Sequence, residues 1–412
     1  TSAAVTAGVA ASAERTYTDT MNTAILEITD LAYRGAGVGR IEGKTCFVPF
    51  TAPGDRVEVL ITEDKKRFSF GEVHRILRPC PERIEPRCPV FTVCGGCDWQ
   101  HLPYEKQVQT KHDILESTLT RIAGINTEGL EISIFPSPSP WNYRTAVQVK
   151  IDPAVGAGFF RKGSNRIVPV GYCPISHPAV NRRLEELNRG TVESPAGGGE
   201  SLAEVELFVD ESGILHERHH PPGERVLPFQ QVNREVNKTI KRRLTEWASG
   251  ALGRGDAVAD LFCGNGNLSL PLAGTVGRIE GWDTSAEALA EGRKRARELS
   301  RNSPVTDRVS AVFHRDEAAR VLKRIAGEGS DYSLLIIDPP RGGVKSLEKE
   351  LPSLRVPWIY YLSCDPPSLA RDLKPLLSGG YRPVMIDLYD MFPQTYHIEA
   401  GVILEKTRNP SR

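Results

Sequence analysis

The sequence lacks an excess of charge of either sign: 52 Lys and Arg residues balance 52 Asp and Glu residues, so the formal net charge is zero. A nucleic-acid partner would therefore have to meet a local basic patch rather than a basic chain. Also missing is any apolar run close to the roughly 20 residues that a membrane span requires. These absences exclude a membrane-spanning helix and leave nucleic-acid binding open.

The N-terminal segment is not expected to be a secretory signal. Residues 1–22 are small and polar, without a basic start followed by a strong apolar block. We predict a disordered tail there and a cytoplasmic location for the protein. In a reducing compartment the eight cysteines are not expected to form disulfides, so metal binding or catalysis must explain any clustering.

The remaining chain predicts a multidomain α/β protein. Residues 23–79 hold five short β-rich runs broken by glycine-containing turns, which is typical of an oligonucleotide-binding (OB-type) β-barrel. Residues 80–227 hold a cysteine-dense loop and mostly strands. Within them, the amphipathic helix 104–124 is a candidate to pack on the catalytic domain. In residues 228–412 strands and helices alternate, which predicts a doubly wound domain that binds ligands at the carboxyl ends of its strands.

A glycine-containing turn follows the first strand of that domain, in "DLFCGNGNLSLPLA". Gly264 and Gly266 let the backbone approach a ligand at a helix N-terminus. A dinucleotide fingerprint would have a third glycine where Ser269 stands. The preceding Asp260 suits the amino group of S-adenosylmethionine better than a pyrophosphate. Asp283, at the end of the next strand, is placed to bond ribose hydroxyls.

Two further acidic residues follow later strands. Asp316 comes after the third strand, near where an adenine would lie, and Asp338 precedes two prolines after the fourth. Proline restricts the backbone, so this loop presents its groups with little freedom to lose. In methyltransferases, substrate and methyl donor meet at such a loop.

Cys364 lies where a β-favouring run ends and a helix begins, in "YYLSCDPPSLARDL". A helix N-terminus lowers the pKa of a thiol, and a cation such as Arg341 would do the same. Asp365 acts in the opposite direction unless it caps the helix. Read alone, this cysteine is either a nucleophile or a small buried side chain.

Glu399 stands at the start of an otherwise apolar strand, where burial would raise its pKa and suit a general base. His397 points to the same face and either orients a substrate or fills the core. Together with a methyl donor, these groups predict one reaction. Cys364 attacks C6 of a flipped-out pyrimidine, C5 takes the methyl group, and Glu399 removes the C5 proton.

Four motifs occur in order: "FQQVN", "DLFCGNGNLSLPLA", "SCDPPSLARDL" and "MFPQTYHIE". With them the sequence resembles the RNA 5-methyluridine methyltransferase family, in its iron–sulfur-containing 23S rRNA branch with an N-terminal TRAM domain, over residues 24–409. The resemblance implies a C-terminal Rossmann-like class I domain that uses S-adenosylmethionine. It implies cofactor contacts from Gln231, Phe262, Asn267, Asp283, Asp316 and Asp338, catalysis by Cys364 and Glu399, and RNA contacts from Arg144, Phe229, Arg341 and His397.

The motif around the nucleophile departs from the family at one position. The family has asparagine after the nucleophile, whereas this chain has Asp365. A carboxylate beside a thiolate raises the thiol pKa, so we expect different tuning of the nucleophile here.

Cys88, Cys94 and Cys97 form a Cys-x5-Cys-x2-Cys run, which indicates a metal. The fourth ligand is Cys173 or Cys80, and spacing alone does not choose between iron–sulfur and zinc. The resemblance implies a [4Fe–4S] cluster held by Cys88, Cys94, Cys97 and Cys173. The other two cysteines, in the barrel and the cofactor loop, are interpreted as packing.

Two alternative functions remain at this stage. One is the same chemistry on transfer RNA, and the other is a non-catalytic iron–sulfur protein that binds RNA. The resemblance implies a monomer that acts on 23S rRNA without a membrane partner. The target nucleotide is not encoded in any motif.

Overall fold

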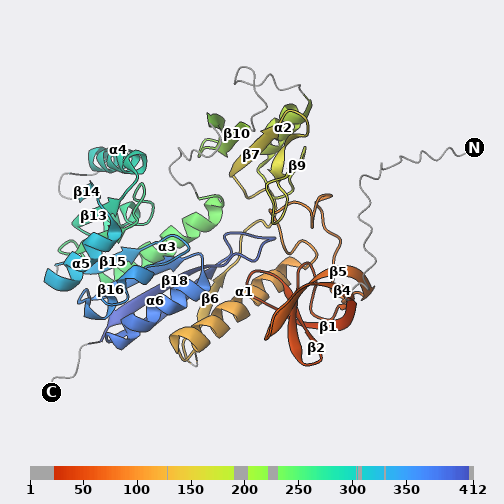
Figure 1. The fold of residues 1–412 in the computed structure, drawn as a ribbon. Coiled ribbons are helices and arrows are strands. Elements are labelled where there is room, and N and C mark those ends of the chain that lie inside the picture. Colours follow the sequence, from red (N-terminus) through yellow and green to blue (C-terminus); the bar gives the residue numbers. More distant parts are fainter. Residues whose placement is uncertain are drawn as a thin grey trace, which may run out of the picture. The chain divides into compact units, whose positions relative to one another are not determined.

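The computed structural model describes residues 23–127, 129–189, 203–220, 231–302, 304, 309–328 and 331–407, and the predicted tail lies outside them. Within this part of the chain, strands form a closed barrel, a five-stranded sheet and an eight-stranded sheet (Figure 1). Two compact units result. The smaller includes residues 37–81, and the larger comprises Leu31–Ala36 and Glu82–Arg412.

The smaller unit is the barrel, closed in the order β1-β2-β3-β5-β4. Alternating residues of each strand point inward, and Cys46 is one of the buried side chains that fill it, as the packing interpretation requires. This confirms the OB-type barrel. Its strands are β1 (Thr23–Leu31), β2 (Gly37–Ile41), β3 (Lys44–Val48), β4 (Arg56–Asp64) and β5 (Phe68–Arg78).

The five-stranded sheet is antiparallel, in the order β11-β10-β7-β8-β9. One amphipathic helix, α2 (Pro178–Arg189), packs its apolar side chains on this sheet. The strands are β7 (Ala146–Asp152), β8 (Gly156–Phe160), β9 (Ile167–Pro169), β10 (Ala203–Val209) and β11 (Leu215–His220).

The eight-stranded sheet has the order β14-β13-β12-β15-β16-β18-β17-β6. All neighbours are parallel except those of β18, which runs antiparallel to both β16 and β17. The strands are β6 (Ile132–Phe135), β12 (Ala257–Leu261), β13 (Arg278–Asp283), β14 (Ser310–Arg315), β15 (Leu334–Ile337), β16 (Trp358–Ser363), β17 (Tyr381–Tyr389) and β18 (Glu399–Lys406).

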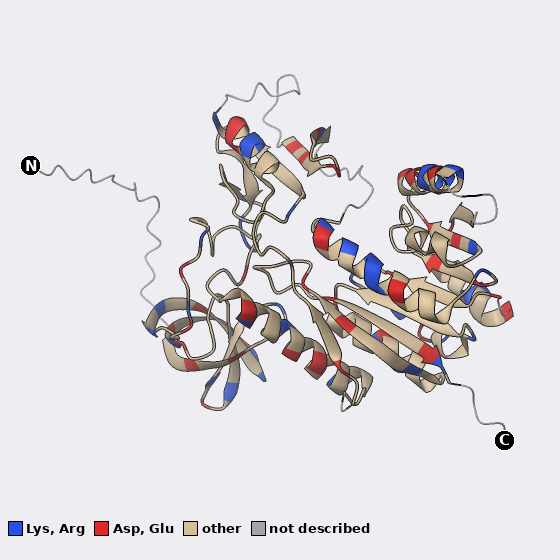
Figure 2. Ribbon diagram, turned by 180° about the vertical axis from the view of Figure 1, so that it is seen from behind, with Lys and Arg blue, Asp and Glu red and all other residues tan. Residues whose placement is uncertain are grey.

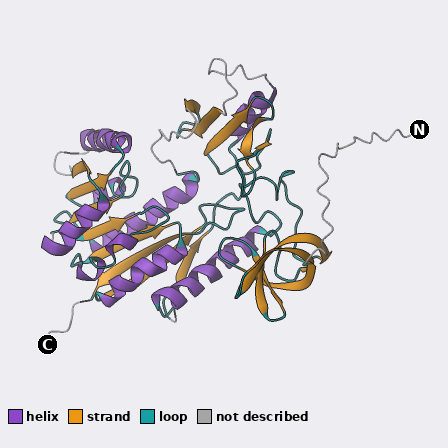
Figure 3. Ribbon diagram, viewed as in Figure 1, coloured by secondary structure: helices purple, strands orange, loops and turns teal. Residues whose placement is uncertain are grey.

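Helices cover both faces of this sheet (Figure 3). Leu335 and Ile337 of β15 pack in one core with α1, α5 and α6, whereas Leu334 and Ile336 pack in another with α3. Alternate side chains of β15 therefore point to opposite faces of the sheet and pack in two different cores, as in a doubly wound domain. The helices are α1 (Tyr104–Thr118), α3 (Arg234–Ala251), α4 (Ala286–Asn302), α5 (Ala318–Glu328) and α6 (Pro366–Ser378), with single turns at Leu119–Ala123, Leu270–Gly274, Lys345–Leu347 and Leu351–Ser353.

One predicted domain boundary differs from the observed arrangement. The prediction placed residues 80–227 in a central domain, yet β6 pairs in parallel with β17, with Ile132 opposite Ile386. Leu115 of α1 lies in the same core as α6, so helix 104–124 packs on the catalytic domain as the sequence suggested. Residues 104–135 therefore join the C-terminal domain, because that sheet offers an edge strand and an apolar face to them. No helix in the described ranges is long and apolar enough to cross a membrane.

Candidate active site

The two candidate catalytic residues meet because β18 is antiparallel. Cys364 follows the last residue of β16, whereas Glu399 is the first residue of β18. Ser363 pairs with Ala400, so the next step along the register brings Cys364 toward Glu399. The thiol and the carboxyl group therefore lie at the edge where a doubly wound sheet binds its ligands.

Burial dominates the electrostatics of this pair. It raises the pKa of the Glu399 carboxyl well above its usual value, and the nearby Asp338 adds to the effect. It also raises the pKa of the Cys364 thiol to about 12, with a further contribution from Glu399. Arg341 favours the thiolate, as predicted, but is outweighed. The expected lowering of the thiol pKa is therefore not found.

Asp365 is the N-cap of α6. Its Oδ2 accepts a hydrogen bond from the backbone N–H of Ser368 at 2.9 Å, which satisfies one of the free donors of the first turn. Pro366 occupies the first helical position, where no N–H is needed. The capping interpretation is confirmed. The other oxygen, Oδ1, accepts from the hydroxyl of Tyr33 at 2.5 Å.

The loop after β12 has a backbone that keeps space for a ligand. Phe262, Gly264 and Gly266 all have positive φ angles, of 61°, 53° and 73°. A Cβ atom at Gly266 would lie 2.8 Å from Leu270 and Phe313, whereas one at Gly264 would meet nothing within 4 Å. Gly266 is therefore required by packing, and the open side of the turn is at Gly264.

Asp260 lies buried beneath this turn. Its Oδ2 accepts from the Ser269 hydroxyl at 2.5 Å, while its Oδ1 has no hydrogen-bond partner. Burial raises the pKa of Asp260 to about 7, and the charges of Asp338 and Asp283 add to this. Burial likewise raises the pKa of Asp338 to about 7. An unpartnered carboxylate oxygen in such a place fits a cationic amino group, as S-adenosylmethionine would supply.

Three other predicted cofactor residues make hydrogen bonds within the protein. The Asp283 carboxylate accepts from the N–H of Gly264 at 2.9 Å and so shapes the loop. Asn267 exchanges two hydrogen bonds with Asn237 on α3. Asp316 accepts from the backbone N–H of Glu317, just ahead of α5, and it pairs with Arg320 one turn later.

Gln231 is half-buried just ahead of α3, whose N-cap is Asn233. Its role in cofactor binding stays a prediction. Phe229 lies outside the described residues.

A cavity of about 900 Å³ lies between the cysteine-dense loop, the five-stranded sheet and the loop that precedes Glu399, and neither Cys364 nor Glu399 is among its lining residues. Among its lining side chains are three of the predicted RNA contacts, Arg144, Arg341 and His397. Burial lowers the pKa of His397 to about 3, with Arg341 contributing, so the ring is neutral. It can therefore orient a substrate through a hydrogen bond but carries no charge at neutral pH.

The same cavity is lined by Cys88, Cys94, Cys97 and Cys173. Burial raises the pKa of each of the first three thiols, and the charge of Cys173 adds to it in all three. Cys80 instead packs on Gly54 within the barrel unit, with its Cβ 3.6 Å from the position of a Cβ there. Across the described ranges, no three His, Cys, Asp or Glu side chains are arranged to hold a single metal ion.

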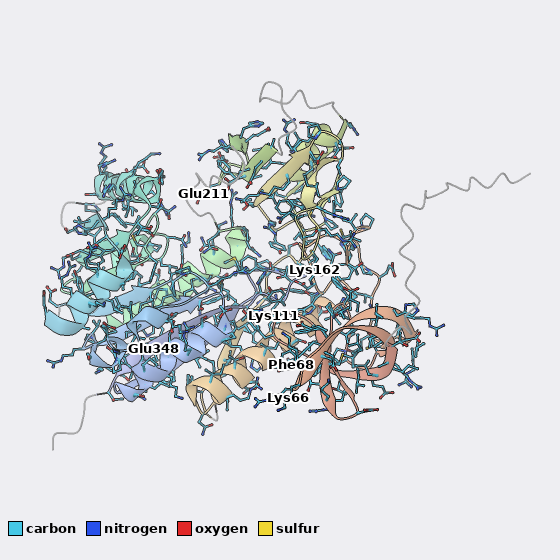
Figure 4. All side chains as sticks on the ribbon, in the orientation of Figure 1. Lys66, Phe68, Lys111, Lys162, Glu211 and Glu348 are labelled. Atoms are coloured by element: carbon cyan, nitrogen blue, oxygen red, sulfur yellow. The ribbon has the colours of Figure 1, made fainter. Side chains whose placement is uncertain are left out.

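Contacts that no sequence pattern indicated hold the loop before Glu399. Lys111 on α1, labelled in Figure 4, is fully buried and pairs with Asp390 at 2.6 Å. Gln107 on the same helix bonds both the backbone N–H and the side chain of Gln394, which has a φ of 69°. In a sequence, polar residues of an amphipathic helix are expected to be exposed to solvent. The anchoring role of Lys111 and Gln107 is therefore evident only from their contacts in the folded structure.

The doubly wound sheet and the acidic glycine-containing turn at its carboxyl edge define a class I methyltransferase. The family described as tRNA (Uracil-5-)-methyltransferase matches residues 223–407, and the TRAM domain matches residues 23–74. A 23S rRNA (uracil(1939)-C(5))-methyltransferase RlmD of Histophilus somni is 30% identical over 431 residues, covering 92% of this chain and 95% of the relative. One of Pectobacterium atrosepticum is 31% identical, covering 89% and 90%.

By these relatives the chain belongs to the RNA uracil-C5 methyltransferase family, as the motifs predicted. The crystal structure of Pyrococcus abyssi tRNA (uracil-54, C5)-methyltransferase in complex with S-adenosyl-L-homocysteine has the same fold. Its TM-score is 0.68 at 23% identity, covering 92% of this chain and 100% of that chain.

Proposed function

We propose that this protein methylates C5 of a specific uridine in 23S rRNA, with S-adenosylmethionine as the methyl donor. The observation that carries the proposal is the placement of Cys364 next to Glu399, with Asp338 and the acidic loop at the same sheet edge. The RNA named for the relatives that match nearly the whole chain is the 23S species, which supports that substrate over tRNA.

In the proposed reaction, the Cys364 sulfur attacks C6 of the flipped-out uracil as a thiolate, and the C5–C6 electron pair moves toward C5 and O4. S-adenosylmethionine, when bound, supplies the methyl group that C5 accepts. The Glu399 carboxylate then takes the C5 proton, the C6–S bond breaks, and the ring double bond is restored. Arg341 favours the thiolate that begins this sequence. Burial of Glu399 suits the base role, since a raised pKa makes a carboxylate a stronger proton acceptor.

A covalent trap tests the proposal. RNA that carries 5-fluorouridine has no C5 proton to remove, so the adduct with Cys364 persists through denaturation. We expect wild-type protein with S-adenosylmethionine to form a band that retains the RNA, and Cys364→Ala to form none. Absence of the band from wild type, or its persistence in Cys364→Ala, would overturn the catalytic assignment.

We propose further that Cys88, Cys94, Cys97 and Cys173 hold a [4Fe–4S] cluster. The donor set supports this, because four thiols surround one cavity whose wall also contains arginine and lysine side chains, which suit an anionic cluster. Its role would be structural or in RNA positioning, because methyl transfer from a sulfonium needs no electrons.

Paired cysteine variants test the ligand set. After anaerobic purification, Cys173→Ser should lose bound iron, sulfide and the broad visible absorption of the cluster. Cys80→Ser is the matched control and should retain all three. Zinc in place of iron, or loss of the metal from Cys80→Ser with retention in Cys173→Ser, would refute this assignment.

The choice of RNA is tested directly by nucleoside mass spectrometry of rRNA and tRNA incubated with labelled S-adenosylmethionine. We expect label in 5-methyluridine of 23S rRNA, and label confined to tRNA would contradict it. This substrate supports a cytoplasmic location. We also expect a monomer, which light scattering of the purified protein would check.

A further inference from the structure

The segment Leu31–Ala36 runs from the last residue of β1 to the residue before β2 but belongs to the larger unit. It brings Tyr33 to the nucleophile turn, where the Tyr33 hydroxyl donates to Asp365 Oδ1 at 2.5 Å. These residues are separated by 332 positions in the chain. A residue from the N-terminal region therefore touches the neighbour of the proposed nucleophile.

At position 365 the sequence resemblance implies an asparagine, whereas this chain has an aspartate. A neutral amide there would cap α6 without adding charge next to Cys364. Burial and Glu399 are the larger causes of the raised thiol pKa, and Asp338 and then the Asp365 carboxylate add to it against the opposing effect of Arg341. Both carboxylate oxygens are occupied, one by the helix N-terminus and one by Tyr33. The charge of the Asp365 carboxylate is therefore accompanied by an additional hydrogen-bond donor, the Tyr33 hydroxyl.

The segment is held in place independently of the Tyr33 hydroxyl. The Gly35 carbonyl accepts from Trp99 Nε1 at 3.0 Å, and the Tyr33 ring meets the edge of Tyr396 at 6.0 Å between centroids. Tyr396 in turn lies 4.3 Å from the ring of His397. Because these contacts involve only the backbone and rings, phenylalanine at position 33 would keep them.

Tyr33 also stays a donor throughout the working pH range. Burial and the Asp365 carboxylate raise the pKa of the Tyr33 phenol, and Tyr396 and Cys364 add smaller effects in the same direction. A phenol that retains its proton can neutralise part of a neighbouring negative charge but cannot add one.

We propose that Tyr33 is a positioning residue for the nucleophile: its hydroxyl holds the Asp365 carboxylate in the capping position and reduces its effect on the Cys364 sulfur. The inference rests on the proposed role of Cys364. It assigns to the segment between the first two barrel strands a task in catalysis that is separate from RNA binding.

The test compares Tyr33→Phe, Asp365→Asn and the double variant by the rate at which iodoacetamide alkylates Cys364, followed peptide by peptide in mass spectra from pH 6.5 to 10. Below the thiol pKa the rate follows the thiolate fraction. We expect Tyr33→Phe to slow alkylation about threefold or more, Asp365→Asn to accelerate it, and Tyr33→Phe to have no further effect in the Asp365→Asn background. Tyr332→Phe, which removes a hydroxyl that donates to Glu280 at 3.0 Å, is the matched control and should behave as wild type.

Alkylation needs neither RNA nor methyl donor, so its outcome is separate from that of the fluorouridine trap. The proposal would be overturned if Tyr33→Phe left the pH profile of alkylation unchanged. It would also be overturned if Tyr33→Phe slowed alkylation equally in the wild-type and Asp365→Asn backgrounds. If thermal melting shows that Tyr33→Phe is unfolded, the Asp365→Asn variant alone tests the proposal. Alkylation of Cys364 in that variant at a rate no faster than in wild type would show that the Asp365 charge does not affect the thiol, and would overturn the proposal. A failed trap with shifted alkylation profiles would refute the proposed reaction and leave the Tyr33 contact standing.

Discussion

At the scale of single residues, the Asp260 carboxyl lies in an environment that disfavours its charged form. Its pKa of about 7 lies above the ordinary 3.8, so the folded chain keeps a proton that the unfolded chain releases. A raised carboxyl pKa therefore lowers stability as the pH rises from about 4 through 7. The difference between the folded and unfolded pKa of this carboxyl corresponds to a loss of at most about 4 kcal/mol.

We predict that Asp260→Asn melts at a higher temperature than wild type at pH 8 without ligand and at a similar temperature at pH 5. The amide retains an acceptor for Ser269 and removes the buried charge. The same variant should bind S-adenosylmethionine about tenfold more weakly or worse by calorimetry, because an unpaired buried charge no longer meets the ligand ammonium. Stability that falls at pH 8, or unchanged affinity, would contradict this account.

A second prediction at this scale concerns Glu399. The variant Glu399→Gln keeps the shape of the side chain and cannot accept the C5 proton. We expect it to accumulate a covalent protein–RNA adduct on ordinary substrate, visible on a denaturing gel, with turnover reduced about 100-fold or more. Free release of methylated RNA at the wild-type rate would remove Glu399 from the role of base.

Cys364 and Glu399 could be proposed from the sequence because an acid in an apolar strand is costly to bury, and because the thiol follows a strand at the ligand-binding edge of the sheet. Tyr33 could not, since nothing near it in the chain reveals a partner at Asp365. The raised thiol pKa was also missed, because burial, its largest cause, depends on the packing of distant segments.

At the scale of elements, α1 serves as an anchor for the loop that precedes Glu399. Lys111 and Asp390 are fully buried, and the Lys111 ammonium also donates to the Phe392 carbonyl at 2.9 Å. Removal of one charge from such a pair leaves the other buried without compensation, which costs about 3–5 kcal/mol.

We therefore predict that Lys111→Met destabilises the protein strongly in urea denaturation, and that adding Asp390→Leu recovers much of the loss. The double variant should still have reduced methylation, because Phe392 loses its donor and the loop is no longer fixed. Equal stability of Lys111→Met and wild type would refute the anchoring role.

The position of β6 shows where prediction of elements from sequence stops. Its four residues form a short β-favouring run of the kind expected in the central region, and the partner strand β17 lies about 250 residues later in the chain. The long strand–helix alternation after residue 228 was predictable, because each strand and helix there carries its own periodic pattern. Pairing between distant segments leaves no such local signal.

At the scale of the whole molecule, neutral net charge means that RNA must be bound by local features. The hairpin that joins β4 and β5 carries Lys66 and Arg67, both exposed, next to a group of three phenylalanines (Phe47, Phe68 and Phe70); Lys66 and Phe68 are labelled in Figure 4. On α3, by contrast, basic and acidic residues are interspersed, and Lys238 and Arg242 pair with glutamates (Figure 2). Of these two elements, the hairpin is the one that combines exposed cations with aromatic rings in the way that single-stranded RNA favours.

We predict that Lys66→Ala with Arg67→Ala weakens RNA binding and lowers the slope of log affinity against log salt by about 1 to 2, while kcat is unchanged. Lys238→Ala with Arg242→Ala removes the same charge from α3 and should leave that slope as in wild type. Fluorescence anisotropy at several salt concentrations gives both values, and identical slopes for the two double variants would refute the assignment to the hairpin.

The antiparallel strand β18 has a consequence for how this protein reaches its working state. It lies between β16 and β17 rather than at an outer edge, so without it both neighbours would present unpaired backbone groups. The Cys364 sulfur and the Glu399 carboxyl group are brought together by the pairing of β18 with β16. The pairing of β18 thus closes the central part of the sheet and brings the two proposed catalytic residues to one edge of it.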